Sequence, residues 1–340
     1  MPPESNESSE SLIEHGSRQP PVLITGLPRS GTTWLVRSMN RHPKVLVFGE
    51  THFFSRRWIA PDKDGTYSPD KLESLWASLS TCPFWAAVPL KEDLGERGPG
   101  WFTRTSRDDI PAVIESARGM VGSNPRPGEV LDAVGRAFCL REGKSFWVEK
   151  TAIEGKHAAR TIRNVPDARF ILTMRDPVGF MRSYKYQGIQ HGRSTRDFYV
   201  DRYHPFLAAL VWRRSYRSLC KLKNRHPEQV SLHVLSSEAN RRAALESICR
   251  QLGVEPADEI FEGLGQRVNS SSLGAEDRAL DRADIAWLRA LCSVEDPEMA
   301  ISDEYPKTGF LDLLKSVPSI IRWGIRYILR YRNKKTIPTT

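Results

Sequence analysis

A short glycine-bounded segment between an apolar run and a helix-like run most constrains the fold of this chain. The apolar run is Val22–Thr25, the segment reads GLPRSGTT over residues 26–33, and Thr32–Asn40 has the composition of a helix. A strand, a glycine turn and a helix in this order form an anion site, because backbone N–H groups converge at the positive end of the helix dipole. The order predicts a phosphate-binding loop at the end of a strand.

This loop differs from the common triphosphate-binding loop at one position. The common pattern is G-x-x-x-x-G-K-[ST], and here Thr32 stands where the lysine belongs, followed by Thr33. Without the lysine a triphosphate loses its main cationic partner, whereas a shorter anion remains plausible, with Arg29 supplying positive charge from inside the loop. The alternative at this point is a glycine turn that binds nothing.

Short apolar runs alternate with helix-like runs along the chain. The expected strands are Val22–Thr25, Val45–Phe48, Phe146–Val148, Phe170–Met174 and Val230–Leu235. The expected helices between them are Thr32–Asn40, Gly155–Asn164, Phe206–Arg225 and Asn240–Leu252. Alternation of this kind indicates right-handed crossovers and an α/β fold, in which helices cover both faces of a parallel sheet in three layers.

The chain divides into three expected regions. Residues 1–19 are polar and read as a disordered tail, with neither a signal peptide nor a membrane anchor. Residues 20–308 form one large α/β domain, and residues 309–340 form a basic amphipathic helix and tail. Residues 55–145 fit the alternation poorly and are interpreted as a helical insertion or lid on the sheet. Its helical runs are Asp108–Val121 and Glu129–Arg141.

The charge and the cysteines limit the partners. The 340 residues carry a formal net charge of +9, which favours anionic partners such as nucleotides, acidic glycans, anionic membranes or nucleic acid. We expect no nucleic-acid partner, because the sequence shows no helix-turn-helix, zinc or RNA-binding motif. Five cysteines without a C-x-x-C or His/Cys cluster indicate reduced, mostly buried thiols of a cytosolic protein and no metal site.

A second anion-binding pattern lies in RFILTMRDPVGFMRSYKYQ. Arg175 ends an expected strand, Asp176 and Pro177 open a helix, and Ser183 follows eight residues after the arginine. An arginine at the carboxyl end of a parallel strand points toward the ligand crevice, and its guanidinium binds a phosphate through paired hydrogen bonds. The alternative is a surface turn with Pro177 at the first helical position.

Together, GLPRSGTTWL and the spacing of Arg175 and Ser183 resemble the sulfotransferases that depend on PAPS, 3′-phosphoadenosine-5′-phosphosulfate. The resemblance implies a P-loop NTPase-like fold, PAPS as donor, PAP as product and no metal requirement. It also implies that Arg175 and Ser183 hold the 3′-phosphate. The loop residues implied to hold the phosphosulfate are Arg29, Ser30, Gly31, Thr32, Thr33 and Trp34.

Two further segments carry the implied catalytic residues. FGETHFF resembles the E-x-H-F-F segment of carbohydrate sulfotransferases that act on heparan-type glycans, which makes Glu50 the base and His52 a residue that orients the site. The family continues with an aspartate where this chain has Ser55. WVEKTAIEGKH resembles the EKTP element, with Ala152 in place of the proline, and implies that Lys150 stabilises charge on the leaving phosphate.

Structural alternatives remain for these residues. Glu50 could cap a helix or form a salt bridge, His52 could be a packed structural histidine, and Lys150 could be a solvated surface lysine. A weaker match, RVNSSSLG, resembles a late basic loop of the family and implies that Arg267 closes over the 3′-phosphate. The alternative for Arg267 is a polar loop leading into a helix.

The C-terminal segment SIIRWGIRYILRYRNKK, residues 319–335, repeats every four residues. Arg322, Arg326 and Arg330 form one stripe, and aromatic residues form the neighbouring one beside an apolar side. This pattern is typical of a helix lying on an anionic membrane. The alternative is a terminal helix docked on the domain with its arginines in water.

The leading hypothesis is therefore an enzyme that moves a sulfuryl group in line from PAPS to a hydroxyl, with a carbohydrate or glycolipid as acceptor. We expect it in the cytoplasm, peripheral to the inner face of a membrane if the C-terminal helix binds lipid. Two alternatives remain: a nucleotide kinase or NTPase-like phosphoryl-transfer enzyme, and a non-catalytic, membrane-associated PAP-binding protein.

Overall fold

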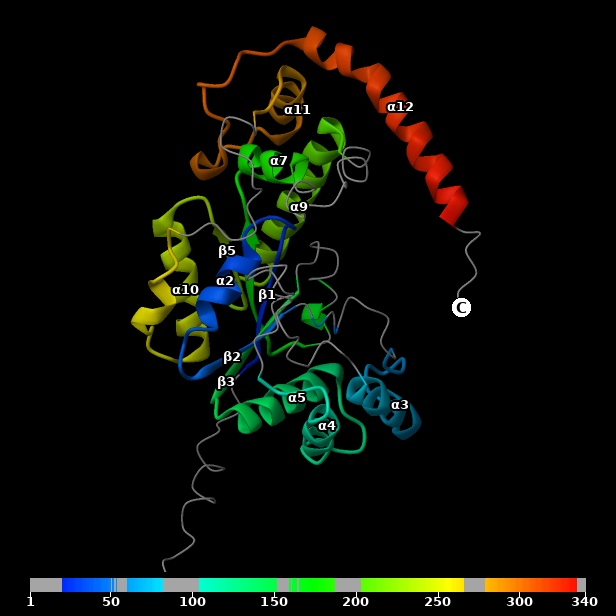
Figure 1. Cartoon of the computed structure of the whole chain (residues 1–340), viewed down its shortest axis with the longest axis vertical. Coiled ribbons are helices and arrows are strands. Elements are labelled where there is room, and N and C mark those ends of the chain that lie inside the picture. The colour runs from blue at the N-terminus through cyan, green and yellow to red at the C-terminus, as the bar shows by residue number, and fades with distance from the viewer. Residues whose placement is uncertain are drawn as a thin grey trace, which may run out of the picture.

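The computed structural model describes residues 20–49, 51, 53, 60–81, 104–151, 159, 161–163, 165–186, 203–265 and 279–334. At its centre is a five-stranded sheet in which all strand pairs are parallel and the order is β2-β3-β1-β4-β5. Figure 1 shows this sheet in the middle of the molecule. The strands are β1 Val22–Gly26, β2 Val45–Gly49, β3 Phe146–Lys150, β4 Arg169–Met174 and β5 Val230–Val234. The expected α/β class and all five expected strands are confirmed, with strand ends that differ by at most two residues.

Helices cover both faces of this sheet. They are α2 Thr32–Met39, α3 Pro69–Ser80, α4 Ile110–Arg118, α5 Pro127–Glu142, α7 Pro177–Lys185, α9 Pro205–Arg225, α10 Glu238–Leu252, α11 Arg282–Cys292 and α12 Phe310–Lys334. Short 3₁₀ turns occur at Asp258–Phe261 and Pro297–Met299. The helices α3 and α11 were not predicted, and the expected helix Gly155–Asn164 lies largely outside the described residues.

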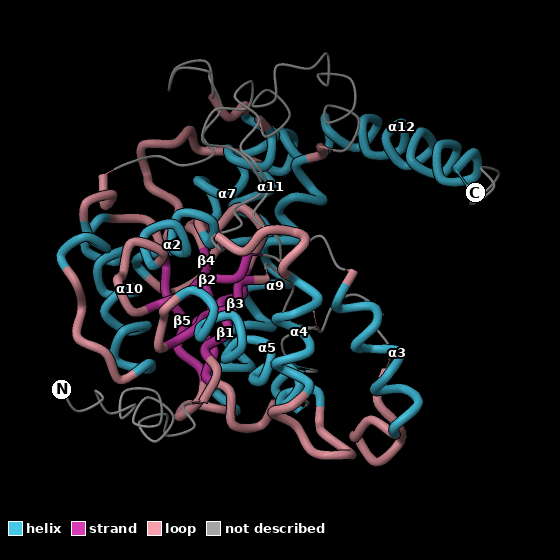
Figure 2. The backbone as a smooth tube through the Cα atoms, turned by 60° about the horizontal axis from the view of Figure 1, so that its bottom comes forward, coloured by secondary structure: helices cyan, strands magenta, loops and turns pink. Residues whose placement is uncertain are grey.

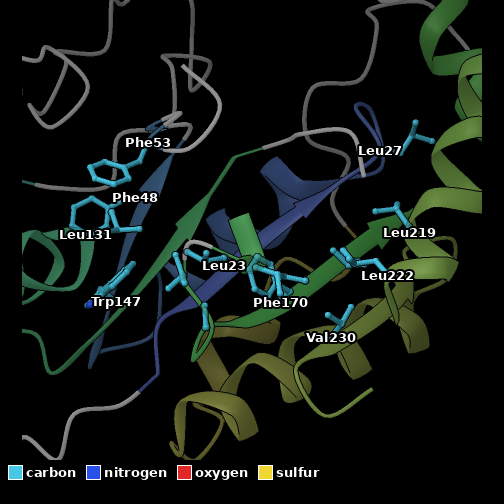
Figure 3. Close-up of a cluster of buried hydrophobic side chains, with 14 of the residues drawn as sticks. Leu23, Leu27, Phe48, Phe53, Leu131, Trp147, Phe170, Leu219, Leu222 and Val230 are labelled. Carbon is cyan, nitrogen blue, oxygen red and sulfur yellow. The ribbon is translucent and has the colours of Figure 1, made fainter. Parts of the chain in front are cut away.

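Alternate residues of each strand belong to two separate cores, because successive side chains of a strand point to opposite faces of the sheet. On one face Phe48, Trp147 and Phe170 join a core shared with α5 and α9 (Figure 3). On the other face Ile24 and Val148 join a core shared with α2 and α10. The strands β1 to β4 are buried on both sides almost throughout, so the three-layer arrangement follows from their apolar sequence, whereas the centre of β5 is half-buried.

Helix periodicity explains how α9 packs into the first of these two cores. In α9 the buried residues Ala208, Trp212, Ser215, Leu219 and Leu222 recur every three or four positions, which places them on one side of the helix. The basic residues of α9 fall between these positions. A run that mixes apolar and basic residues can therefore form a helix that packs on the sheet through one side.

Part of the region 55–145 packs directly against the sheet. Its helix α5 packs against β3 so closely that a Cβ at Gly135 would lie 2.4 Å from the indole of Trp147. Pro127 opens α5, and Gly143, with φ of +66°, ends it in the left-handed conformation that glycine tolerates. The role of the region as a lid over an acceptor stays a prediction.

The last described helix, α12, leads away from the rest of the molecule in both views (Figures 1 and 2). It begins at Phe310, nine residues before the repeating segment that predicted it. Its first half packs on α11. No helix in the described part of the chain combines the length and the apolarity that a membrane span requires.

The cysteines that the structure describes are free thiols. Cys139, Cys249 and Cys292 are buried and Cys220 is half-buried, as the sequence predicted, whereas Cys82 lies outside the described residues. Burial raises the pKa of the Cys139 thiol to about 12. These thiols therefore belong to the packing of the core.

Candidate active site

The predicted phosphate loop leaves β1 pressed against β4. At Gly26, a Cβ would lie 2.2 Å from the carbonyl oxygen of Thr173, and the next residue, Leu27, donates its N–H to that oxygen at 3.0 Å. Only glycine allows the two backbones to approach so closely. The glycine at the start of the loop is thus explained by packing between β1 and β4.

The loop then turns through two left-handed residues. Ser30 donates its N–H to the carbonyl oxygen of Leu27 at 3.1 Å, which closes the turn. Arg29 has φ of +70° and is the one non-glycine residue with positive φ in the described part of the chain, and Gly31 follows with φ of +96°. Such a conformation costs free energy for a residue with a Cβ and clusters at functional sites, and successive N–H groups in a turn of this kind can form an anion-binding concavity.

The helix α2 begins directly after this turn with an open N-terminus. Its first intrahelical hydrogen bond runs from the N–H of Leu35 to the carbonyl of Gly31 at 3.0 Å, so the N–H groups of Thr32, Thr33 and Trp34 have no acceptor within the helix. No side chain caps this end, and its first turn contains no acidic residue. The positive end of the helix dipole is therefore available to an anion.

The end of β4 carries the second predicted motif. Arg175 follows the strand, and its carbonyl accepts a hydrogen bond from the indole of Trp212 at 2.9 Å. Asp176 caps α7 by accepting the N–H of Gly179 at 2.6 Å. A Cβ at Gly179 would lie 2.5 Å from Oδ2 of Asp176 and 2.7 Å from Nε of Arg175, so the arginine side chain lies against the first turn of α7 and a larger residue there would displace it or the capping aspartate.

The two motifs meet in space although 154 residues separate them. Nε of Arg29, in the loop after β1, donates to Oγ of Ser183, in α7, at 3.2 Å. The contact joins a residue implied to hold the phosphosulfate to one implied to hold the 3′-phosphate. The structure therefore brings both motifs into one site at the carboxyl ends of β1 and β4, which is where ligands bind in open parallel sheets.

Two predicted loop residues have side chains that hold the loop in place. The hydroxyl of Ser30 is buried and lies 2.6 Å from Oγ1 of Thr173. The indole of Trp34 donates to the carbonyl of Gly263 at 2.9 Å and lies under the guanidinium of Arg241, whose carbon is 5.3 Å from the ring centroid. These contacts tie the loop and α2 to β4 and to the segment after α10.

Lys150 ends β3 beside the loop and is only 3% exposed, so it is not a solvated surface lysine. Its Cα partners are Ile24 in β1 and Gly49 in β2. Because β1 lies between β3 and β4, Lys150, which ends β3, and Arg175, which follows β4, belong to the two strands that flank β1. Lys150 is level with Ile24 and Ile171, so its backbone lies two strand positions across the sheet from β4 and four residues short of Arg175 along it.

The neighbouring residue, Glu149, is a buried carboxyl group that the sequence analysis did not single out. Thr51 donates to Oε1 of Glu149 at 2.7 Å, and the hydroxyl of Thr151 donates to the same oxygen. Burial raises the pKa of Glu149 from 4.5 to about 7, while the hydrogen bonds from Thr151 and Thr51 and the charge of Lys150 oppose that rise. This cluster ties the end of β2 to the end of β3.

A buried ion pair supports the helix that carries Ser183. Nζ of Lys185 lies 2.5 Å from Oδ2 of Asp284 and 3.0 Å from Oδ2 of Asp281, and the hydroxyl of Tyr203 donates to the fully buried Asp284. Burial and the charge of Asp284 raise the pKa of the Tyr203 hydroxyl well above its usual range. The network fixes α7 against α11, and sequence reasoning missed it because α11 itself was not predicted.

Three predicted site residues lie outside the described residues: Glu50, His52 and Arg267. Their neighbours are placed. Gly49, directly before Glu50, pairs with Lys150, and Thr51, directly after it, is bonded to Glu149. Among the described residues, no group of three His, Cys, Asp or Glu side chains could hold a metal ion.

The model of the sulfotransferase family matches residues 20–259. The chain belongs to the sulfotransferase family. The match spans the phosphate loop, Lys150, Arg175 and Ser183, so a sulfuryl-transfer enzyme is the supported class. No curated protein matches the sequence.

Solved structures similar to this sulfotransferase carry related names. The sulfotransferase domain from the Synechococcus PCC 7002 olefin synthase is 18% identical, with 90% of this chain and 96% of that chain covered and a TM-score of 0.44. The sulfotransferase STF9 from Mycobacterium avium is 13% identical, with 86% and 81% covered and a TM-score of 0.39. The mouse sulfotransferase SULT7A1 complexed with PAP is 14% identical, with 86% and 82% covered and a TM-score of 0.36.

Proposed function

We propose that this sulfotransferase transfers a sulfuryl group from PAPS to a hydroxyl of a carbohydrate or glycolipid acceptor. The observation that carries the proposal is the hydrogen bond from Arg29 to Ser183. It joins the loop at the open N-terminus of α2 to the helix after Arg175. A donor with a phosphosulfate at one end and a separate phosphate at the other needs two such anion sites side by side.

The residues around the loop suit the two ends of the donor. The N–H groups that start α2, the hydroxyls of Thr32 and Thr33 and the guanidinium of Arg29 would bind the phosphosulfate. Arg175 and Ser183 would bind the 3′-phosphate, and Arg267 would close over it. A phosphosulfate carries less negative charge than a triphosphate without its metal ion, which fits a loop with Thr32 in place of the lysine.

The chemistry needs a base and a positive charge near the transferred group. PAPS supplies a sulfuryl group on a phosphate leaving group. Glu50 would accept the proton of the acceptor hydroxyl as the acceptor oxygen bonds to sulfur. The bond from sulfur to the bridging phosphate oxygen then breaks, its electron pair stays on PAP, and Lys150 stabilises the charge that develops there. The pairing of Gly49 with Lys150 supports this division of roles.

The acceptor class rests on the resemblance of FGETHFF to the carbohydrate sulfotransferases and on the net charge of +9. A positively charged enzyme attracts acidic glycans and acidic lipid headgroups. The test is a screen of sugar, glycolipid and phenol acceptors with labelled PAPS. Labelling of sugars or glycolipids is expected, and labelling of phenols alone would contradict this acceptor class.

Donor binding is tested by calorimetric titration with PAP, with and without Mg²⁺, and with ATP for comparison. We expect PAP to bind without Mg²⁺ and Arg175→Ala to weaken binding at least about tenfold, because a charge-assisted contact to phosphate is lost. The matched control is Arg169→Ala, which removes an exposed arginine at the opposite end of β4 and should leave binding unchanged. Mg²⁺-dependent ATP binding without PAP binding would refute the donor assignment.

The roles of Glu50 and Lys150 are tested separately from donor binding. Glu50→Gln keeps the shape of the side chain but removes the base, so turnover should fall by about 10²-fold or more while the PAP affinity stays unchanged. Lys150→Met should also lower turnover, because it removes the charge that stabilises the leaving phosphate. Full turnover in Glu50→Gln would show that another group accepts the proton.

A further inference from the structure

The exposed apolar side chains of this protein are concentrated on one helix. Eight large hydrophobic side chains are exposed in the described part of the chain, and six of them belong to α12. The other two, Leu140 in α5 and Leu210 in α9, stand singly. Single exposed hydrophobic residues are ordinary on a protein surface, whereas a contiguous group marks an interaction site.

The group on α12 forms a continuous line, which we call the α12 stripe. It consists of Phe310, Leu314, Val317, Ile321 and Ile325, with exposed fractions of 71%, 46%, 39%, 60% and 54%. The steps between these residues are four, three, four and four positions, so their side chains share one face of the helix. Leu311, 69% exposed, lies beside the stripe.

A different face of α12 is attached to the protein. The indole of Trp287 in α11 donates to Oγ of Ser316 at 2.8 Å, and Nε of Arg282 donates to Oδ1 of Asp312 at 3.3 Å. Ser316 is buried although its neighbours on the stripe are exposed. The helix is therefore already docked, and its remaining apolar face is held outward rather than covered by the domain.

The charge of the helix indicates what covers the stripe. The one acidic residue of α12 is Asp312, which is paired with Arg282. The basic residues of the helix are Lys315, Arg322, Arg326, Arg330, Arg332 and Lys334. A second copy of the same helix would bring like charges together, whereas an anionic lipid surface attracts them and takes up apolar side chains at the same time.

We propose that the α12 stripe docks on an anionic lipid surface. In Figure 1, α12 lies at the end of the molecule where α7 and α11 are found, and α7 begins directly after β4. Arg175 follows β4 at this same end of the sheet. A protein docked through α12 therefore holds its candidate site on the side of the membrane headgroups, although the docking itself is independent of the proposed reaction.

The test is sedimentation of the full chain with lipid vesicles. Vesicles of phosphatidylcholine with phosphatidylglycerol are compared with vesicles of phosphatidylcholine alone. We expect at least about tenfold stronger binding to the anionic vesicles, weakened by high salt. Leu314→Glu and Ile321→Glu should each lower binding at least about tenfold, because each places a charge in the face that the lipid would cover. Leu140→Glu, the same change at an exposed leucine outside α12, should leave binding unchanged.

Several outcomes would overturn the proposal. These are no binding to either vesicle, equal binding to both, and binding that the stripe variants do not affect. A dimer seen by light scattering that Ile321→Glu dissociates, without vesicle binding, would assign the stripe to a second copy of the chain. PAP titration and thermal melting of each variant keep this result separate from the donor site, because a folded variant with normal PAP affinity has lost only its membrane contact.

Discussion

The buried carboxyl group of Glu149 gives the sharpest test of the structure, because replacing it should stabilise the protein. The substitution is Glu149→Gln, which keeps the length of the side chain and a carbonyl oxygen that can accept from Thr51 and Thr151. It removes the ionisable group from a position that is 4% exposed. Any difference between the two proteins that depends on pH then reports the ionisation of this one group.

The magnitude follows from the pKa. Burial raises the pKa of Glu149 from 4.5 to about 7, and each pKa unit is worth about 1.4 kcal/mol, so ionisation in the folded protein costs about 3 kcal/mol. Between these two values the folded state holds a proton that the unfolded state has released. Stability from this group is therefore complete below pH 4.5 and is lost as the pH rises to about 7.

The assay is urea unfolding of the wild type and of Glu149→Gln across this pH range. The free energy of unfolding should be similar for the two proteins in acid, and Glu149→Gln should become more stable by up to about 3 kcal/mol at slightly alkaline pH. Taking the difference removes the titration of all other groups. A difference that does not change with pH would refute the reasoning, since it would mean that Glu149 ionises normally. A variant that becomes less stable than the wild type as the pH rises would show that the charged form is the one that the two threonines hold.

The remaining predictions concern the backbone and the support of the site. Gly26→Ala should cost several kcal/mol, measured by thermal melting, because its Cβ would lie 2.2 Å from a backbone oxygen, whereas Gly122→Ala, with no atom within 4 Å, should be nearly neutral. Asp284→Asn should destabilise by about 3 kcal/mol or more and lower the PAP affinity, because it leaves Lys185 half-buried without its closest partner; an unchanged melting temperature would contradict this. Ser183→Ala should weaken PAP binding several-fold with an unchanged melting temperature, and equal binding would place the 3′-phosphate elsewhere.

Most of the fold could be predicted from the sequence because its strands, apart from β5, are buried on both faces. Such strands are short apolar runs bounded by polar residues, and the run Val45–Gly49 is an example that needs no tertiary information. The helices α3 and α11 were not predicted from the sequence. In α11 the buried residues Ile285, Leu288 and Cys292 recur at helical spacing, so the sequence does contain the apolar pattern of this helix.

The candidate site could be predicted only where one short segment contains the whole pattern. The loop from Gly26 to Thr33 is such a segment, and so is the spacing from Arg175 to Ser183. Their contact could not be predicted, because it depends on the strand order. A sequence shows that β4 follows β3, but the structure is needed to show that β1 lies between them and so places Arg29 beside α7.

The hydrogen bonds of Glu149 could not be predicted either, because its partners follow two different strands. Within β3 it is one charged residue beside Lys150, and the match to the family motif drew attention to the lysine. Its hydrogen-bond partners are Thr151, two residues away, and Thr51, which is 98 residues away. Thr51 comes within reach only because β2 pairs with β3 rather than with β1. A buried carboxyl group between two strand ends therefore holds in register the residues that precede Thr51 and Thr151 in the chain, and these are the proposed base, Glu50, and Lys150.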